Sequence, residues 1–193
     1  MFTIDGHLDL SMNSLEWNRD LTRSTFEINS REQGLHDKPD RGNALVSLPA
    51  LRKGNIGLVV ATQIARFVAP ENSLPGWNSP AQAWAQTQGQ LAWYQAMVEQ
   101  GEMSQIRNWT ELEAHLADWH DGKELEKKPV GFILSLEGAE SILNLDYLEK
   151  AYESGVRALG PAHDGQGRCA FGTDSSAPCS VNGQSLICKI DAV

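Results

Sequence analysis

The chain has 193 residues, a length that suits one domain of ordinary size or part of a larger one. Apolar residues make up 41% and charged residues 21%, a composition typical of globular proteins, which excludes a disordered chain. The net charge of −9 argues against nucleic acid and anionic membrane surfaces as partners. No apolar run approaches the length of a membrane span, and the N-terminus lacks the pattern of a secretory signal, so we expect a cytoplasmic protein.

The first third of the chain contains two segments with the pattern of strands. The first begins at Phe2 with FTIDGH, and the second, NIGLVVATQIARF over residues 55–67, is an almost continuous apolar run rich in β-branched residues. Such a run is typical of a strand that is buried on both faces, as in a parallel sheet. Residues 17–44 between them are polar and contain glycine and proline breakers, so we expect a long loop there.

Two helices are expected after the second strand. Ser79 can cap the first, Pro80 suits its first turn, and Gly101 can end it. The second begins at Thr110, which is spaced to form a capping box with Glu113.

The rest of the chain continues the alternation of strand and helix. We expect a third strand over residues 129–136, a short helix over 145–154 and a fourth strand over 155–163. A segment rich in glycine and serine then runs to residue 183, and a final helical stretch follows. This order predicts an α/β fold with about four parallel strands. Neither GxGxxG after the first strand nor GxxxxGK[ST] occurs, which disfavours a nucleotide-binding sheet.

Several residues of metal-binding type have a more ordinary interpretation. His115 and His120 lie among charged residues of the second helix, so we expect both on a solvated helix face. Cys169, Cys179 and Cys188 have no CxxC spacing and no nearby histidine pair, which disfavours a zinc finger. An odd number of cysteines without a signal peptide predicts free thiols in a reducing compartment.

Polar side chains lie at or just after the end of each expected strand. His7 and Asp9 follow the first strand, Gln63 lies at the end of the second, Glu137 closes the third and His163 closes the fourth. In a barrel of parallel strands the active site lies at the carboxyl ends of the strands. The sequence therefore predicts a functional site at this edge.

His7 and Asp9 are the best candidates for metal ligands. Residues two apart in an extended strand share a face, and an imidazole nitrogen with a carboxylate oxygen suits a divalent ion such as zinc. Glu137 could complete or bridge the site, because a carboxylate after a buried strand is costly unless its charge is compensated. The alternative is that His7 and Asp9 only hydrogen-bond the backbone at the end of the strand.

Three motifs in order resemble one enzyme family: DGHLDL (residues 5–10), GFILSLEGAESI (131–142) and GVRALGPAHDGQGRCAFGTDSS (155–176). SLPALRKGNIG before the second strand fits the same pattern. The chain resembles the membrane (renal) dipeptidase family, binuclear zinc metallopeptidases of the amidohydrolase-like barrels, and in particular its bacterial members. The resemblance implies that residues 1–193 form a single partial domain, the N-terminal half of a (β/α)8 TIM-type barrel.

The resemblance also implies roles for the residues at the strand ends. His7 and Asp9 match the ligands of the first metal, and Glu137 matches the carboxylate that bridges the two metals. His163 matches the histidine that contacts the substrate and helps to polarise the scissile carbonyl. The expected reaction is hydrolysis of a dipeptide by a water that zinc has acidified.

The chain departs from the family pattern after His163, because no histidine follows it. The family supplies two further histidines for the second metal and an aspartate for the proton, and we expect these to lie outside the chain. The expected partner is therefore a missing C-terminal half or a second copy. One alternative is a catalytically inactive truncated remnant or interaction protein. Another, weaker alternative is a mononuclear amidohydrolase-like lyase or deacetylase that uses His7, Asp9 and Glu137.

Overall fold

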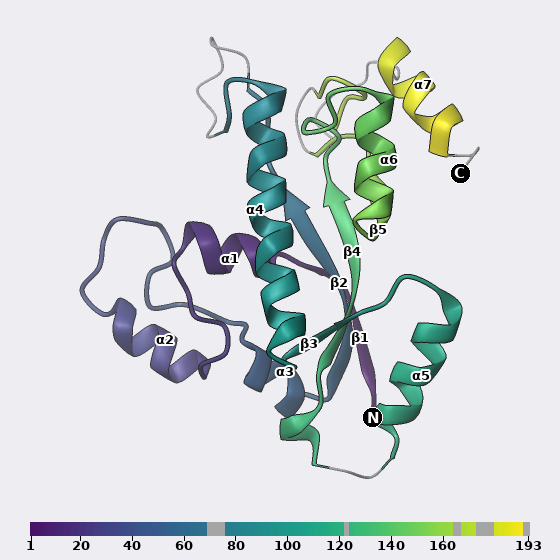
Figure 1. Cartoon of the computed structure of the whole chain (residues 1–193). Coiled ribbons are helices and arrows are strands. Elements are labelled where there is room, and N and C mark those ends of the chain that lie inside the picture. Colours follow the sequence, from purple (N-terminus) through teal and green to yellow (C-terminus); the bar gives the residue numbers. More distant parts are fainter. Residues whose placement is uncertain (69–75, 122–123, 164–166, 173–179, 191–193) are drawn as a thin grey trace. The chain divides into compact units, whose positions relative to one another are not determined.

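The computed structural model describes residues 1–68, 76–121, 124–163, 167–172 and 180–190 (Figure 1). Strands and helices alternate along most of the chain. In order they are β1 (Thr3–Leu8), α1 (Leu10–Glu16), α2 (Thr25–Glu32), α3 (Leu48–Lys53), β2 (Ile56–Ile64), α4 (Pro80–Glu99), β3 (Met103–Gln105), α5 (Trp109–Trp119), the 3-10 turn η1 (Leu125–Lys127), β4 (Val130–Glu137), α6 (Leu145–Glu153), β5 (Val156–Gly160) and α7 (Val181–Ile190).

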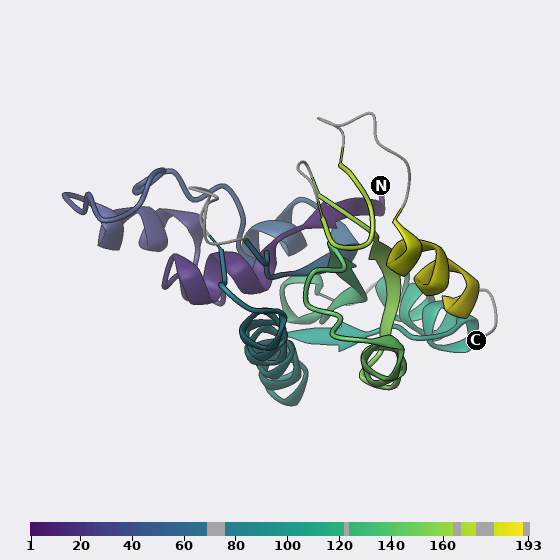
Figure 2. The ribbon, with the colours of Figure 1, turned by 90° about the horizontal axis from the view of Figure 1, so that it is seen from above.

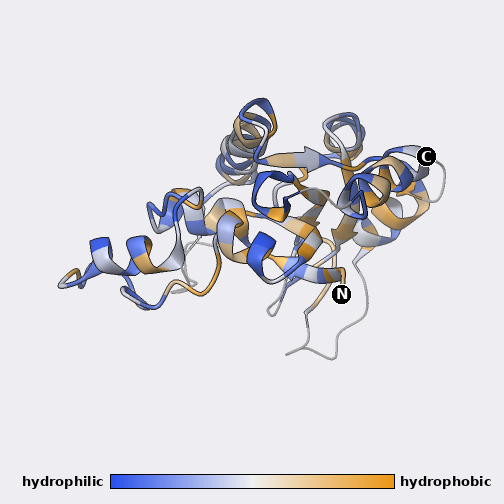
Figure 3. Ribbon diagram, turned by 90° about the horizontal axis from the view of Figure 1, so that it is seen from below, coloured by the Kyte–Doolittle hydropathy of each residue, from blue (hydrophilic) through white to orange (hydrophobic). Residues whose placement is uncertain are grey.

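The strands form one sheet of five, in the order β1-β2-β4-β3, with β5 also paired to β4. The pairs β1–β2, β3–β4 and β4–β5 are parallel, which confirms the predicted α/β class. Hydrophobic residues, orange in Figure 3, concentrate on the strands, and most of β2 and β4 is buried. The sequence predicted about four strands and missed β3, since three residues are too few to show a periodic pattern.

The chain divides into two compact units. The first unit comprises Met1–Thr62 and Ala92–Ile133, and the second comprises Gln63–Leu91 and Leu134–Val193. The expectation of one partial barrel domain over all 193 residues stays a prediction.

In the first unit, the expected loop over residues 17–44 contains helix α2, so this prediction was wrong. Ser24 caps α2 in a capping box: its hydroxyl accepts from Glu27 N, and the Glu27 carboxylate accepts from Ser24 N. A single polar helix with one buried aliphatic residue, Ile28, gives almost no apolar periodicity. The S-x-x-E spacing was the available signal.

The prediction of a solvated His115 was also wrong. His115 is buried, and its Nε2 lies 2.7 Å from the carbonyl oxygen of Gly57 on β2. The ring lies against Gly131 of β4, where a Cβ atom would overlap it. His120 is exposed, as expected. The cap of α5 also differs, because Asn108 accepts from Glu111 N at 3.0 Å and the helix begins before Thr110.

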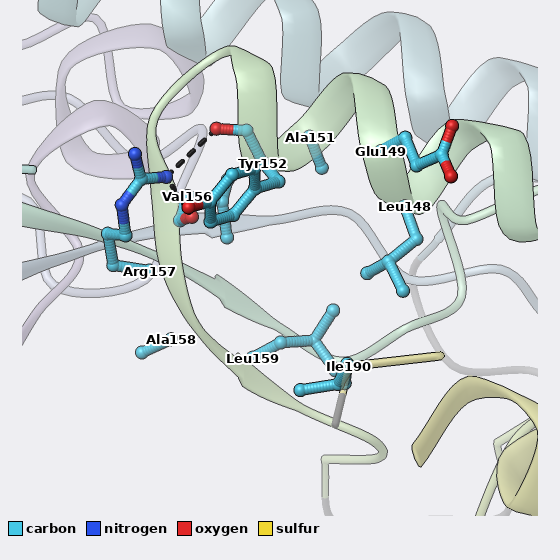
Figure 4. A pocket seen from close by; sticks show the side chains of 9 residues that line it. All are labelled: Leu148, Glu149, Ala151, Tyr152, Val156, Arg157, Ala158, Leu159 and Ile190. Carbon is cyan, nitrogen blue, oxygen red and sulfur yellow. Dashed lines mark hydrogen bonds between the residues drawn. The ribbon is translucent and has the colours of Figure 1, made fainter. Parts of the chain in front are cut away.

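In the second unit, α6 leads into β5 through Gly155, whose φ of +101° favours glycine. Helices α6 and α7 lie side by side (Figures 1 and 2). A mainly apolar pocket of about 230 Å³ lies between α6, β5 and Ile190 of α7 (Figure 4). Arg157 at its edge donates to Tyr152 O at 2.9 Å and to Val156 O at 2.8 Å.

The predictions about the cysteines and about membrane-spanning segments can be compared only with the described residues. Cys169 and Cys188 form no disulfide among the residues that the structure covers, whereas Cys179 lies outside them. Within the same residues, every helix is too short or too polar to cross a membrane.

Candidate metal centre

The first half of the predicted site lies at the end of β1, in the first unit. Pairing between β1 and β2 is irregular between Asp5 and Leu8, and Asp5 Oδ1 accepts from the His7 backbone N at 3.0 Å. Such an irregularity redirects a side chain at a strand end. His7 Nε2 lies 3.6 Å from Asp9 Oδ1, and the two side chains are 55% and 29% exposed.

Asp9 is placed differently from the sequence expectation. It does not extend β1 but occupies the N-cap position of α1. The two side chains approach each other because the chain turns from strand to helix between them, and not because they alternate along one strand. The prediction that they converge therefore agrees with the geometry for a different structural reason.

Other residues of the first unit hold Asp9 in place. Thr62 Oγ1, at the end of β2, donates to Asp9 Oδ1. The Asp9 carbonyl oxygen accepts from Asn13 Nδ2 at 2.9 Å and from Asn13 N at 3.1 Å. Arg19 in turn donates to Asn13 Oδ1 at 2.9 Å and to both carboxylate oxygens of Glu32. None of these partners was identified from the sequence, because the motif itself names only His7 and Asp9.

The distance between the ligand-type atoms of this pair fits a zinc ion. Two ligand atoms that bind a tetrahedral zinc at about 2.1 Å lie about 3.4 Å from each other. The 3.6 Å between His7 Nε2 and Asp9 Oδ1 is close to that value and too long for a hydrogen bond between them.

The second half of the predicted site lies after β4 and β5, in the second unit. Glu137 is the last residue of β4, and Gly138, with φ of +84°, turns the chain after it. His163 Nε2 lies 2.5 Å from Glu137 Oε1, and the two side chains are 31% and 15% exposed. His163 Nδ1 lies 3.2 Å from Arg66 Nη2.

Arg66 decides which nitrogen of His163 carries the proton. A guanidinium group has only hydrogen-bond donors, so Nδ1 of His163 must accept from Arg66. The proton of the neutral ring then lies on Nε2, which donates to Glu137 Oε1. His163 is thus set as an Nε2–H donor.

A buried carboxylate lies next to this pair. Glu140 is 6% exposed, and burial raises its pKa, whereas the positive charges of Arg66 and Arg168 act in the opposite direction. Gly138 and Gly167 leave room for the Glu140 carboxylate, since a Cβ atom at either position would overlap it.

Gln63, which the sequence placed at the end of the second strand, and Arg168 both have local partners. Gln63 Nε2 donates to Thr87 O at 2.5 Å, and Arg168 Nη1 donates to Ile142 O at 3.1 Å. The segment that follows His163, residues 164–166, lies outside the described residues. Within each unit, then, the structure brings together His7 with Asp9 and Glu137 with His163.

No family model matches the chain, and no curated protein matches it. Among solved structures, the chain is similar to the dipeptidase AC, a metallopeptidase of family M19, with a TM-score of 0.71 and 19% identity. The chain resembles a dipeptidase of this family in fold.

Two further solved structures agree with this result. They are the probable dipeptidase PvdM from Pseudomonas aeruginosa (TM-score 0.65, 15% identity) and an amidohydrolase from the same organism (TM-score 0.55, 16% identity). The matches cover 99–100% of this chain but only 55%, 44% and 43% of those chains. The chain therefore spans about half the length of the structures that it matches, and the parallel sheet has the architecture of part of a TIM barrel.

Proposed function

We propose that this chain carries the first-metal half of a metallohydrolase site that cleaves dipeptides. His7, Asp9 and Glu137 would hold a zinc ion, and His163 would contact the substrate. The observation that carries the proposal is the His7–Asp9 pair, whose ligand-type atoms lie 3.6 Å apart at the end of a strand, in a fold similar to that of a metallopeptidase.

The position of Glu137 in the fold supports its addition to this pair. The active sites of α/β barrels lie at the carboxyl ends of the strands. Glu137 is the last residue of β4, and a cation would compensate the cost of its partly buried charge.

The chemistry requires an electrophilic centre and a hydrogen-bond donor. A bound zinc ion would supply an acidified water at neutral pH. His163 would turn its Nε2–H from Glu137 to the oxygen of the scissile carbonyl, where negative charge develops. Arg66 would keep the ring in the tautomer that can donate this proton. The remaining ligands of a complete site would come from further sequence or from a second copy of the chain.

Calorimetric titration of the metal-free chain with zinc tests the ligand set. We expect one site with His7, Asp9 and Glu137 as ligands. The variants His7→Asn, Asp9→Asn and Glu137→Gln should each lose more affinity than the roughly 10–100-fold that outer partners of a metal ligand cost. His36→Asn is the matched control, because His36 is an exposed histidine outside the site.

The same samples distinguish two of the functions left open by the sequence, a dipeptidase and a non-catalytic interaction protein. Zinc-loaded chain is assayed for hydrolysis of a panel of dipeptides, alone and with the downstream sequence supplied. Hydrolysis that disappears in His7→Asn supports the peptidase, whereas zinc binding without hydrolysis in either sample favours a non-catalytic interaction protein. Zinc affinity that is equal in wild type and all three ligand variants would overturn the proposal.

A further inference from the structure

We propose that Thr62 is a positioning residue, whose hydroxyl holds the carboxylate of Asp9 in the orientation needed to bind a metal. This inference rests on the proposed function, because it assumes that Asp9 is a ligand. All residues that carry it belong to the first unit.

The hydroxyl of Thr62 has a defined role because its surroundings leave one strong acceptor. Thr62 is 1% exposed, and its single hydroxyl proton can be directed to Asp9 Oδ1 or to Leu8 O, which is 3.4 Å away. A hydrogen bond to a carboxylate is shorter and stronger than one to a neutral carbonyl. Thr62 therefore donates its hydroxyl proton in a hydrogen bond to Asp9. This bond occupies one lone pair of Oδ1 and leaves the other lone pairs of the carboxylate available.

The backbone of Thr62 is held from two helices. Its carbonyl oxygen accepts from Ser11 Oγ of α1 at 3.0 Å and from Tyr94 Oη of α4 at 2.9 Å. Tyr94 is completely buried, and its ring stacks on Phe132 of β4 with 5.0 Å between centroids. Burial raises the pKa of the Tyr94 hydroxyl, so the group stays a donor at all physiological pH values. Thr62 thus presents its hydroxyl from a rigid point.

The carboxylate of Asp9 does not cap helix α1, although Asp9 occupies the N-cap position. Aspartate is among the preferred N-cap residues because its carboxylate accepts from the free backbone N–H groups of the first helical turn. Asp9 is the N-cap of α1, yet its side chain makes no capping hydrogen bond. The carboxylate instead faces Thr62 and His7. Helix α1 therefore lacks the stabilisation of a side-chain cap. We infer that the Asp9 carboxylate is held in another orientation because it is needed to bind a metal.

A specific consequence follows for a chain without the hydroxyl. Once Thr62 no longer holds Oδ1, the carboxylate can rotate to cap α1 and leave His7. The fold would lose little, because a helix cap replaces the lost hydrogen bond, but the two ligand atoms would no longer be set for one ion. Removal of the hydroxyl should therefore weaken metal binding far more than it weakens the fold.

The test compares Thr62→Val, which keeps the shape and removes the hydroxyl, with Thr62→Ser, which keeps the hydroxyl. Zinc affinity is measured by calorimetry, and the visible absorption spectrum of the Co²⁺-loaded chain reports the geometry of the ligands. We expect Thr62→Val to lose about 10–100-fold in zinc affinity and to alter the Co²⁺ spectrum. Thr62→Ser should resemble wild type, and the Tm of both metal-free variants should stay near that of wild type.

Several results would overturn the inference. They are wild-type zinc affinity in Thr62→Val, an equal loss in Thr62→Ser, or a fall in the metal-free Tm of Thr62→Val that accounts for its weaker binding. Thr62→Ala is the second variant if Thr62→Val does not fold, and wild-type affinity in Thr62→Ala would also reject the role. If wild-type chain binds no zinc, or binds it equally after His7→Asn, the proposed function itself has failed.

Discussion

At the scale of single residues, Arg66 and His163 show how one contact sets a chemical state. Arg66 can only donate, so its contact with Nδ1 leaves the proton of the neutral His163 ring on Nε2. A histidine that helps to polarise a carbonyl needs its proton on the nitrogen that faces the substrate. The sequence predicts a role for His163 but gives no sign of Arg66, which lies 97 residues earlier and belongs to no motif.

Replacement of Arg66 by methionine should release this constraint. We expect the wild-type His163 ring to show a single Nε2–H tautomer at neutral pH, and Arg66→Met to show a mixture in which Nδ1 is also protonated. The measurement is a ¹⁵N–¹H correlation spectrum of histidine-labelled protein, with His163→Gln to assign the signal. Arg66→Lys is the control, since lysine also donates and accepts nothing. An unchanged tautomer in Arg66→Met would show that Arg66 does not set it.

His115 should make stability sensitive to mild acid. Burial lowers its pKa below the ordinary value of 6.5, although Gly57 O and the charge of Asp118 act in the opposite direction. As pH falls below about 6.5, the unfolded chain takes up a proton that the folded chain resists, so the free energy of unfolding falls until the folded-state pKa is reached.

The slope for this one group is at most about 1.4 kcal/mol per pH unit. Between pH 7.5 and 5.5, the free energy of unfolding measured in urea should therefore fall more steeply for wild type than for His115→Gln, whose side chain is neutral throughout. Parallel pH profiles for the two proteins would show that His115 contributes nothing to the acid sensitivity.

At the scale of elements, α2 is anchored by charge and not by an apolar face. Glu32 is 5% exposed; Arg19 donates to both its oxygens, and Arg41 Nη1 donates to Oε1 at 2.8 Å. The sequence could not show this pairing, since a glutamate and two arginines in a polar segment resemble any solvated stretch. The apolar strands β2 and β4 were predicted because burial on both faces requires a continuous run of apolar residues.

Loss of the Glu32 charge should destabilise the chain by about 3 kcal/mol at pH 7, because the buried Arg19 loses its carboxylate partner, whereas the partly buried Arg41 keeps its ion pair with Asp37. The hydrogen bond from Arg19 lowers the pKa of Glu32 from 4.5 to about 2. Its contribution is therefore complete above pH 4.5 and is lost as pH falls towards 2. In denaturant titrations, the free energy of unfolding of Glu32→Gln should be lower than that of wild type at pH 7. The two values should approach each other at pH 2.5. Glu153→Gln, at an exposed helix position, should stay within about 0.5 kcal/mol of wild type at both pH values.

At the scale of the whole molecule, the proposed zinc binding and folding should be coupled. A zinc ion bound only by the folded chain would stabilise it by about 2.7 kcal/mol at a free zinc concentration of 100 Kd. Thermal unfolding with and without zinc should show this gain in wild type and not in His7→Asn or Glu137→Gln. A full gain in Glu137→Gln would mean that Glu137 is not a ligand.

The sequence by itself determined the features that depend on a few neighbouring residues. Apolar runs predicted the parallel strands, and the polar residues at their ends predicted where chemistry would gather, because both follow from burial along a few neighbouring residues. Only the tertiary structure decided that Thr62, and not its neighbour Gln63, faces Asp9. Adjacent residues of a strand point to opposite faces, and which face meets Asp9 depends on the pairing of β2 with β1, whose paired residues lie 53 or 54 positions earlier. The burial of His115 was decided in the same way, by the approach of α5 to Gly57 and Gly131, since no local pattern states where a helix will dock.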